Sequence, residues 1–365
     1  MTSSPPITLW KYIARRYLAQ VGLIAVGLLA IIYMFEAFEL LRRASGHDVP
    51  TQTVMFMALI KLPDTAQIIF PFVFLLSGLS LFWQLNRASE LVVMRATGIS
   101  AWRFVAPVAL VAFACGLFNI AVLQPVGAAS LTRYATLEAQ YLGTPRRIAA
   151  LNNQGLWVRD SNQNRVRLLH AQKVTMPQAK MTDLMILDLD DKGTLLTRFD
   201  AAGGFYDNEA WVLANGQETD ANGTVTKFAG KRVDAGVTRD DLFAGFTEAG
   251  TFAFWTLPVH IKTLAESGFP TRSLILYYQN LLATPFLWVA MALVAVAVSL
   301  TPHRMGRTVL LLSLGVGAGF FYFLFARYFE ALTLTQRIPE IVAAWVPVTI
   351  ATLVPLTSLL QTEDG

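Results

Sequence analysis

Long apolar stretches alternate with short polar ones along most of the chain, and this pattern predicts six membrane-spanning helices. A spanning helix needs about 20 mostly apolar residues, because lipid offers the backbone no hydrogen-bond partner. The segments that meet this requirement are Tyr17–Leu41, Val54–Phe82, Trp102–Leu123, Leu274–Leu300, Val309–Ala326 and Ile341–Leu360. The last three contain no Asp, Glu, Lys or Arg, which makes them the clearest spans.

The stretch between the third and the fourth span is much more polar. Residues 143–272 hold 15 Lys and Arg and 15 Asp and Glu, more than half of the charged residues in the chain. Short strand-forming runs alternate there with turn residues, among them Gly193, Asn222 and Gly223. This pattern predicts an inserted all-β domain with a sandwich, jelly-roll or open-barrel fold.

The predicted organisation is therefore an α-helical membrane protein of three spans, a β domain and three more spans. The expected domains are an N-terminal membrane half (1–142), the inserted domain (143–272) and a C-terminal membrane half (273–365). Composition agrees, since 54% of the 365 residues are hydrophobic, only 15% are charged and the mean hydropathy is +0.47.

The N-terminus begins with basic residues, as a signal peptide does. The apolar run that follows is too long for a signal peptide and no small-residue cleavage site comes after it, so we expect the first span to be retained. The single cysteine, Cys115, excludes a disulfide within the chain.

Basic residues predict which ends of the spans face the cytosol. Those that lie on one side of the predicted spans are Lys11, Arg15, Arg16, Arg87, Arg95, Arg103, Arg304 and Arg307. The positive-inside rule assigns that side to the cytosol. Both termini are then cytosolic and the β domain lies on the opposite, outer side.

Further bases lie near the outer ends of the spans, where the rule does not expect them. They are Arg42, Arg43, Lys61, Arg133, Arg327 and Arg337. In one interpretation they reach lipid headgroups or pair with carboxylates. The candidate carboxylates are Glu36, Glu39, Asp64, Glu138, Glu330 and Glu340. In the other interpretation they form a rim for an anionic substrate, because guanidinium groups bind phosphate oxygens bidentately.

No motif indicates that the chain carries out chemistry of its own. GxxxxGK[ST], HExxH and GxSxG are absent from the sequence, so hydrolysis of ATP, peptide or ester is not expected. The histidines are far apart, so we predict no metal site, and we expect neither a cofactor nor a nucleic-acid partner. Gly315 and Gly319, four residues apart in the fifth span, predict close packing against another helix.

Residues 86–100, NRASELVVMRATGIS, predict a short cytosolic helix between the second and third spans. Asn86 or Ser89 is the candidate N-cap, Glu90 suits the first turn, and Gly98 is the candidate C-cap. The side chains expected to face outward are Leu91, Val92, Val93 and Met94. The helix either packs beneath the spans or presents these side chains to a partner subunit that supplies energy.

Several segments together resemble the LptF/LptG family of lipopolysaccharide export permeases. SELVVMRATGIS (89–100) is similar to the coupling helix of that family, and the run Glu90–Met94 favours its LptG branch over its LptF branch. LPDTAQIIFP (62–71) resembles the second span, NNQGLWVRD (152–160) the first outer strand, and ELLRRASG (39–46) the end of the first span. The similarity follows the order of the chain over nearly its whole length.

The resemblance implies a permease subunit of an ABC transporter in the inner membrane of a Gram-negative cell. Such a subunit extracts lipopolysaccharide from the outer leaflet and passes it to a periplasmic bridge for outer-membrane assembly. The implied partners are LptF, two copies of the ATPase LptB, which bind the ATP, and LptC with the LptA bridge. The inserted domain would be a periplasmic β-jellyroll.

The resemblance also implies roles for individual residues. Those that would couple to the ATPase are Glu90, Leu91, Val92, Met94 and Arg95. Those that would bind the substrate are Phe38, Arg42, Arg43, Lys61 and Arg133. The second span departs from the family at Asp64, since some members have Lys after the proline; here Lys61 lies two residues before Pro63.

Three alternatives to an LptG-type subunit stay open. An LptF-type subunit would have the same role. A secondary transporter would need acidic residues near mid-membrane, and the last three spans have none. A membrane scaffold or sensor would use the β domain as a docking module.

Overall fold

The structure is a computed structural model that describes most of the chain. The described residues are 7–46, 49–97, 100–142, 148–152, 155–162, 165–175, 180–190, 193–207, 210–234, 249–266, 271–300 and 308–364. They divide into two compact units. The helical unit comprises Met1–Arg42, Ala58–Ser130 and Ile275–Gly365, and the sheet unit comprises Arg43–Met57 and Leu131–Leu274.

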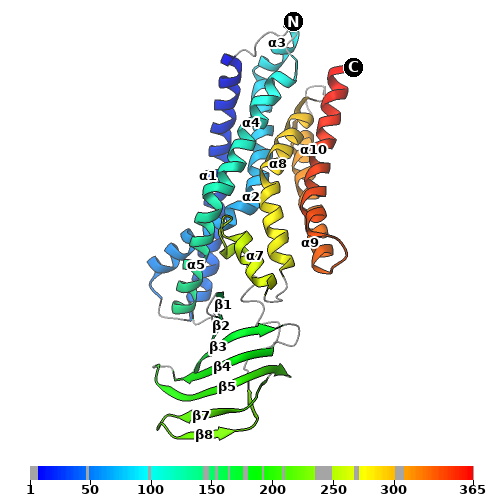
Figure 1. Ribbon diagram of the computed structural model, residues 1–365. Helices are drawn as coiled ribbons and strands as arrows, with labels where there is room; N and C mark the ends of the chain where they lie inside the picture. The colour runs from blue at the N-terminus through cyan, green and yellow to red at the C-terminus, as the bar shows by residue number, and fades with distance from the viewer. Residues whose placement is uncertain are drawn as a thin grey trace. The chain divides into compact units, whose positions relative to one another are not determined.

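Long helices make up most of the described chain (Figure 1). They are α1 (Ile7–Ala44), α2 (Thr51–Arg87), α4 (Trp102–Phe118), α5 (Gln124–Tyr141), α8 (Arg272–Leu300), α9 (Thr308–Leu334) and α10 (Glu340–Asp364). The short helices are α3 (Glu90–Ala96), α7 (Leu257–Glu266) and the 3-10 turn η2 (Ala249–Thr251). A π-helix, η1 (Asn119–Leu123), joins α4 directly to α5.

In the described part of the chain, five helical segments are long and apolar enough to cross a membrane. They are Ile7–Ala44, Thr51–Arg87, Trp102–Glu138, Arg272–Leu300 and Glu340–Gln361. The remaining predicted span, Val309–Ala326, lies inside the 27-residue helix α9. The predicted class, a helical membrane protein with an inserted β-sheet region, is confirmed. The predicted range 143–272 is not all-β, because η2 and α7 lie within it.

The core of the helical unit is built around Trp288 of α8. Its ring stacks on Phe74 with centroids 4.5 Å apart, and Phe70 meets it edge-on at 5.2 Å. The buried Tyr17 of α1 donates a hydrogen bond of 3.0 Å from its hydroxyl to the carbonyl oxygen of Phe74. Aromatic contacts and one hydrogen bond thus hold α1, α2 and α8 together at one level.

Glycines set the distances between the helices of this unit. A Cβ on Gly315 or Gly319 of α9 would lie 2.6 Å from a side-chain atom of Leu79 or Leu75 in α2. The close packing predicted for these two glycines is therefore confirmed. A Cβ on Gly116 of α4 would lie 2.5 Å from the Cα of Pro285 in α8, which is main chain and cannot rotate away.

The sheet unit contains nine described strands joined in one antiparallel sheet. They are β1 (Ile148–Asn152), β2 (Gly155–Asn162), β3 (Arg165–Thr175), β4 (Lys180–Leu189), β5 (Leu195–Asp207), β6 (Ala210–Leu213), β7 (Gly216–Asp220), β8 (Val225–Phe228) and β9 (Lys231–Asp234). Neighbours follow chain order from β1 to β6, β9 pairs with β6, and the long strand β5 also pairs with β7. Gly193 and Gly223 take φ of +82° in the turns after β4 and β7, which confirms the turns predicted there.

Register places the buried residues of the central strands on one face. Leu169 of β3 lies opposite Ile186 of β4, which lies opposite Phe199 of β5, and all three are buried. The alternation of buried and exposed positions along β4 agrees with this arrangement.

Arg167 shows that the sheet curls. It forms a bidentate ion pair with the buried Asp188 of the neighbouring strand β4, with Nε to Oδ1 at 2.5 Å and Nη2 to Oδ2 at 2.7 Å. Its Nη1 also donates to the main-chain oxygen of Asp234 in β9, although β4, β5 and β6 separate β3 from β9 in the sheet. The sheet therefore bends until strands distant in its order meet.

The contact of Gly116 with Pro285 predicts that a glycine-to-alanine substitution lowers stability at this position but not at an uncrowded glycine. We expect Gly116→Ala to destabilise the protein by about 1–3 kcal/mol, because α4 and α8 must separate to admit the methyl group. Gly22→Ala in α1 is the control, since its Cβ would meet nothing within 4 Å. Thermal melting of the detergent-solubilised protein, followed by size-exclusion chromatography, measures both. Equal melting temperatures would contradict the packing at Gly116.

Candidate functional site

The short helix α3 is fastened to the start of α1 by its first residue. The Tyr12 hydroxyl donates a hydrogen bond to Oε2 of Glu90 at 2.8 Å, and Arg16 Nη1 lies 3.3 Å from Oε1. The Arg16 guanidinium also lies over the Tyr12 ring, 4.9 Å from its centroid. A carboxylate at a helix N-terminus further suits the helix dipole. Both carboxylate oxygens of Glu90 therefore have a hydrogen-bond partner within the same chain.

The chain turns sharply from α2 into α3. Ser89 has a φ of 58°, in the left-handed region that non-glycine residues seldom adopt. Its carbonyl oxygen accepts a hydrogen bond from the Val93 amide. This bond places Ser89 at the N-cap of α3, one of the two N-cap positions proposed from the sequence. This turn points the first residue of α3 toward α1.

Most of the apolar surface of α3 that the structure describes faces the bundle. Leu91 is only 5% exposed and belongs to the core of the helical unit, and Met94 packs partly buried against the same core. The expectation that Leu91 faces outward is wrong, because residues three apart share a helix face and here that face meets the spans. Val93 is 60% exposed. Only the backbone of Val92 and Arg95 is described.

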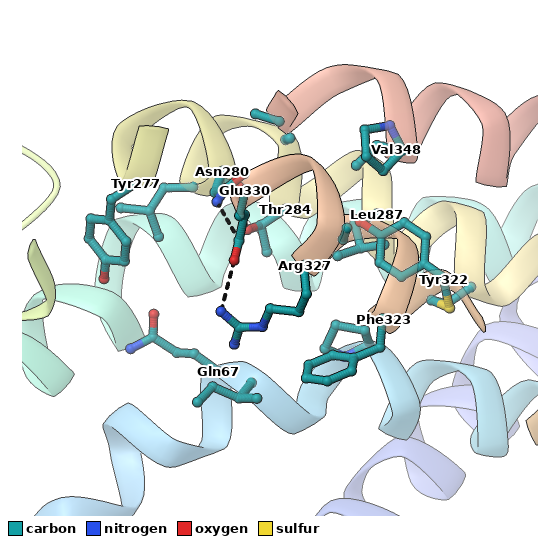
Figure 2. A pocket seen from close by; sticks show the side chains of 18 of the residues that line it. Gln67, Tyr277, Asn280, Thr284, Leu287, Tyr322, Phe323, Arg327, Glu330 and Val348 are labelled. Carbon is teal, nitrogen blue, oxygen red and sulfur yellow. Dashed lines mark hydrogen bonds and ion pairs between the residues drawn. The ribbon is translucent and has the colours of Figure 1, made fainter. Parts of the chain in front are cut away.

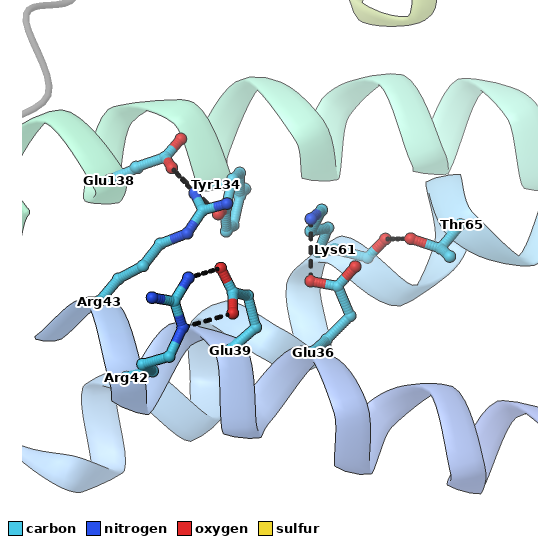
Figure 3. A network of polar contacts seen from close by, with 8 residues as sticks. All are labelled: Glu36, Glu39, Arg42, Arg43, Lys61, Thr65, Tyr134 and Glu138. Atoms are coloured by element: carbon cyan, nitrogen blue, oxygen red, sulfur yellow. Dashed lines mark hydrogen bonds and ion pairs between the residues drawn. The ribbon is translucent and has the colours of Figure 1, made fainter.

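The bases on α1 and α2 that were predicted to lie on the outer side are paired with carboxylates in the helical unit (Figure 3). Arg42 donates to both oxygens of Glu39, at 2.9 and 2.7 Å, one turn back along α1. Lys61 Nζ lies 2.8 Å from Oε2 of Glu36. The Arg42 side chain is nevertheless 72% exposed.

In the sheet unit, Arg43 pairs with Glu138 of α5 at 3.4 Å, and Tyr134 donates to the same carboxylate at 3.2 Å. On α9, Arg327 lies 2.8 Å from Glu330. The pairing interpretation of these bases is therefore confirmed for Arg42, Arg43, Lys61 and Arg327, each with a carboxylate that the sequence analysis named.

Pairing does not exclude a second partner for these bases. Exposed ion pairs contribute only about 0–1 kcal/mol each, so an anionic group competes with the carboxylates at small cost. A guanidinium such as Arg42 presents two parallel donors that match a phosphate as well as they match Glu39.

Phe38 and Arg133 complete the predicted substrate set. Phe38 lies one turn before Arg42 on the same side of α1 and is 74% exposed. Arg133, in the part of α5 that belongs to the sheet unit, is exposed and forms no ion pair with the residues that the structure describes. The binding roles of these residues stay predictions.

Sequence reasoning missed Tyr12 and Arg16 as the partners of Glu90. Their spacing of four residues places both on one face of α1, and the sequence could have shown this. The sequence could not show that they contact Glu90, because that residue lies 74 or more positions away and no local pattern encodes such a contact.

The long apolar helices of the described chain, with an antiparallel sheet inserted between them, define a multi-span membrane protein. The sequence pattern of the family described as "Lipopolysaccharide export system permease LptF/LptG" matches residues 11–361. The chain belongs to this family.

Two relatives are described as lipopolysaccharide export system permease protein LptG. The one from Escherichia coli strain K12 is 23% identical over 361 residues, which cover 96% of this chain and 97% of the relative. The one from Escherichia coli O6:H1 strain CFT073 matches with the same identity and coverage.

Proposed function

We propose that the chain is the LptG-type permease subunit of an ABC transporter in the inner membrane of a Gram-negative cell. In this role it extracts lipopolysaccharide from the outer leaflet and passes it to a periplasmic bridge. It pairs with an LptF subunit, takes its energy from an LptB ATPase dimer, and delivers the lipid through LptC to LptA. Family membership and the LptG relatives over nearly the full chain support the proposal.

The observation that carries the proposal is that one helix, α1, connects the two predicted sites. Its first turns contact Glu90 of α3, and its last turns carry Glu39 and Arg42. At 1.5 Å per residue these contacts lie about 45 Å apart along the helix. No proline interrupts α1, whereas α2, α4, α8 and α10 each contain at least one. A continuous helix transmits a displacement of α3 over that distance.

The exposed surface of α1 supports a substrate path along it. Only 6% of the most apolar 18-residue stretch of α1 is buried inside this chain, whereas 50% of the corresponding stretch of α2 is buried. Large apolar side chains such as Leu23, Val26 and Phe35 are well exposed on it. On α9, Phe320 and Phe321 are exposed as well. We infer that these surfaces hold acyl chains between the two permease subunits while the bases at the end of α1 hold the phosphates.

Basic residues support the proposed orientation. The start of α1, helix α3 and the end of α10 lie at one end of the helical unit (Figure 1). Arg16 and Arg87 lie at that end, next to α3, so we assign it to the cytosol. Both termini are then cytosolic and the sheet is periplasmic.

The coupling role of α3 is tested by comparing Glu90→Lys with Tyr12→Phe. We expect Glu90→Lys to abolish copurification with the LptB ATPase and to slow ATP-dependent lipopolysaccharide release at least tenfold, because it places a cation where the partner meets an acid. Tyr12→Phe removes a hydrogen bond from Glu90 but keeps its charge, so we expect the ATPase to stay bound. A Glu90→Lys complex that assembles and releases lipid normally would rule out the coupling role.

The Tyr12→Phe variant also separates two roles of the carboxylate. If Glu90 only fastens α3 to α1, both variants reduce lipid release and both retain the ATPase. That result would leave the partner-binding role of Glu90 without support.

Substrate binding at the end of α1 is tested with a photoreactive residue at Phe38. We expect the double change Arg42→Glu and Arg43→Glu to reduce lipopolysaccharide crosslinking at least tenfold, since each charge-assisted contact contributes roughly 1.5–3 kcal/mol. Lys227→Glu, at an exposed base of β8 that is not among the predicted rim residues, is the control. Undiminished crosslinking in the double variant would leave these arginines as partners of Glu39 and Glu138 alone.

Orientation is tested by labelling in a Cys115→Ser background. A cysteine replacing Asn222, exposed in the turn between β7 and β8, should react with an impermeant maleimide in intact spheroplasts. A cysteine replacing Thr97, exposed after α3, should react only after lysis. The reverse pattern would invert the topology and with it the placement of the substrate site.

A further inference from the structure

A cavity of about 350 Å³ in the helical unit is lined by a mixture of polar and apolar side chains (Figure 2). Oε1 of Glu330 accepts a hydrogen bond from Asn280 Nδ2 at 3.1 Å, and Oε2 accepts one from Arg327 Nη1 at 2.8 Å. Because such pairs share the walls with apolar side chains such as Leu287, the cavity favours no single ligand over water. A more specific feature lies in the sheet unit, on helix α7.

Helix α7 (Leu257–Glu266) is packed into the sheet unit by one side. Leu257 is fully buried, and Leu264, two turns later on the same side, is 5% exposed. The imidazole ring of His260 lies against the Phe252 ring, with centroids 4.6 Å apart. These contacts fix the orientation of the helix within its unit, so its other side is held outward.

The outward side of α7 carries apolar side chains. Trp255 is 64% exposed and Val259 is 67% exposed. The Leu257 amide donates to the carbonyl oxygen of Ala253, four residues back, so the turn before the helix already follows a helical path and places Trp255 one turn before Val259. The exposed Lys262 follows three residues later on the same side. At about 100° per residue, this side lies opposite Leu257.

The chain confines α7 to the neighbourhood of the bilayer surface. The span α8 begins at Arg272, and only residues 267–271 separate it from α7, so the gap is at most about 20 Å. The sheet unit that contains α7 also contains one end of each of the spans formed by α1, α2 and α5. Helix α7 therefore belongs to the unit in which these spans leave the membrane.

The boundary between lipid and water fits the outward side of α7. An indole is favoured at that boundary because its body is apolar and its N–H is polar. An aliphatic side chain beside it can enter the acyl region, and a lysine can lay its stem along apolar groups while its ammonium reaches the phosphates. A protein partner fits less well, since lysine is depleted in the buried centres of protein interfaces.

We propose that α7 is an anchor that docks on the bilayer surface. Trp255 and Val259 enter the boundary between headgroups and acyl chains, and Nζ of Lys262 contacts phospholipid phosphates. The anchor ties the sheet unit to the membrane at a point separate from the spans. The proposal does not depend on lipopolysaccharide transport, because it rests only on α7 and on the span that follows it.

The depth of α7 in the bilayer is measured with a spin label at Val259→Cys in a Cys115→Ser background. The full-length protein, with the subunits that copurify with it, is placed in nanodiscs of phosphatidylethanolamine and phosphatidylglycerol. Collision of the label with oxygen, which concentrates in lipid, is divided by its collision with a water-soluble nickel chelate. Labels at Asn222, exposed in the turn between β7 and β8, and at Leu353, exposed on α10, give the reference values for water and for lipid.

We expect the oxygen-to-nickel ratio at Val259 to lie between the two references and roughly fivefold or more above that at Asn222. Trp255→Asp should lower the ratio at Val259 roughly threefold, because a carboxylate replaces the indole at the boundary. Phe205→Asp is the matched control, since Phe205 is an exposed aromatic residue of β5 in the same unit, and it should leave the ratio unchanged. Elution as a single peak confirms that each variant is folded.

A ratio at Val259 equal to that at Asn222 would overturn the proposal, because this side of α7 would then face water. Slow collision with both reagents would overturn it as well, since the label would then lie against protein. These two outcomes are read in the protein that keeps Trp255, so they decide the proposal even should Trp255→Asp fail to fold. A folded Trp255→Asp variant with an unchanged ratio would show that the indole does not anchor the helix.

Discussion

Close contact between helices, made possible by glycine, is the constraint on which the helical unit depends. In lipid no hydrophobic effect drives helices together, so packing has to come from van der Waals contact at short distance. Gly315 and Gly319 let α9 approach α2, and Gly116 lets α4 approach α8 until a methyl group no longer fits. The aromatic contacts around Trp288 add to this packing where α1, α2 and α8 meet.

This packing leaves α1 as the least covered helix of the unit. The core holds it mainly through Tyr17, and α3 holds it through Tyr12 and Arg16, while most of its apolar surface faces away from the chain. Near its far end, Glu36 of α1 is paired with Lys61 of α2, and the exposed Arg42 is paired with Glu39 within α1 itself. A continuous helix with little of its apolar surface covered by the chain suits a part that moves, and on the proposed function α1 carries the motion of the ATPase to the lipid.

The helical unit also contains a locally unfavourable feature at η1, a buried polar group that is not hydrogen-bonded among the described residues. A π-helix joins α4 to α5 and keeps the segment helical, and the amide oxygen of its first residue, Asn119, has no hydrogen-bond partner among the described residues. The α3 turn at Ser89, with its positive φ, is a second strained position, and it is what directs Glu90 toward α1.

The sequence alone determined the class of the protein, because the signals for it are local. Apolar runs of about 20 residues can only be satisfied as helices in lipid, and alternating runs with glycine turns can only form strands. It also indicated the carboxylates that pair with Arg42 and Lys61, which lie close in sequence or at matching span ends. Tertiary structure decided the rest. Leu91 is buried and Glu90 is held by Tyr12 because of contacts between helices far apart in the chain, and such contacts leave no periodicity for the sequence to show.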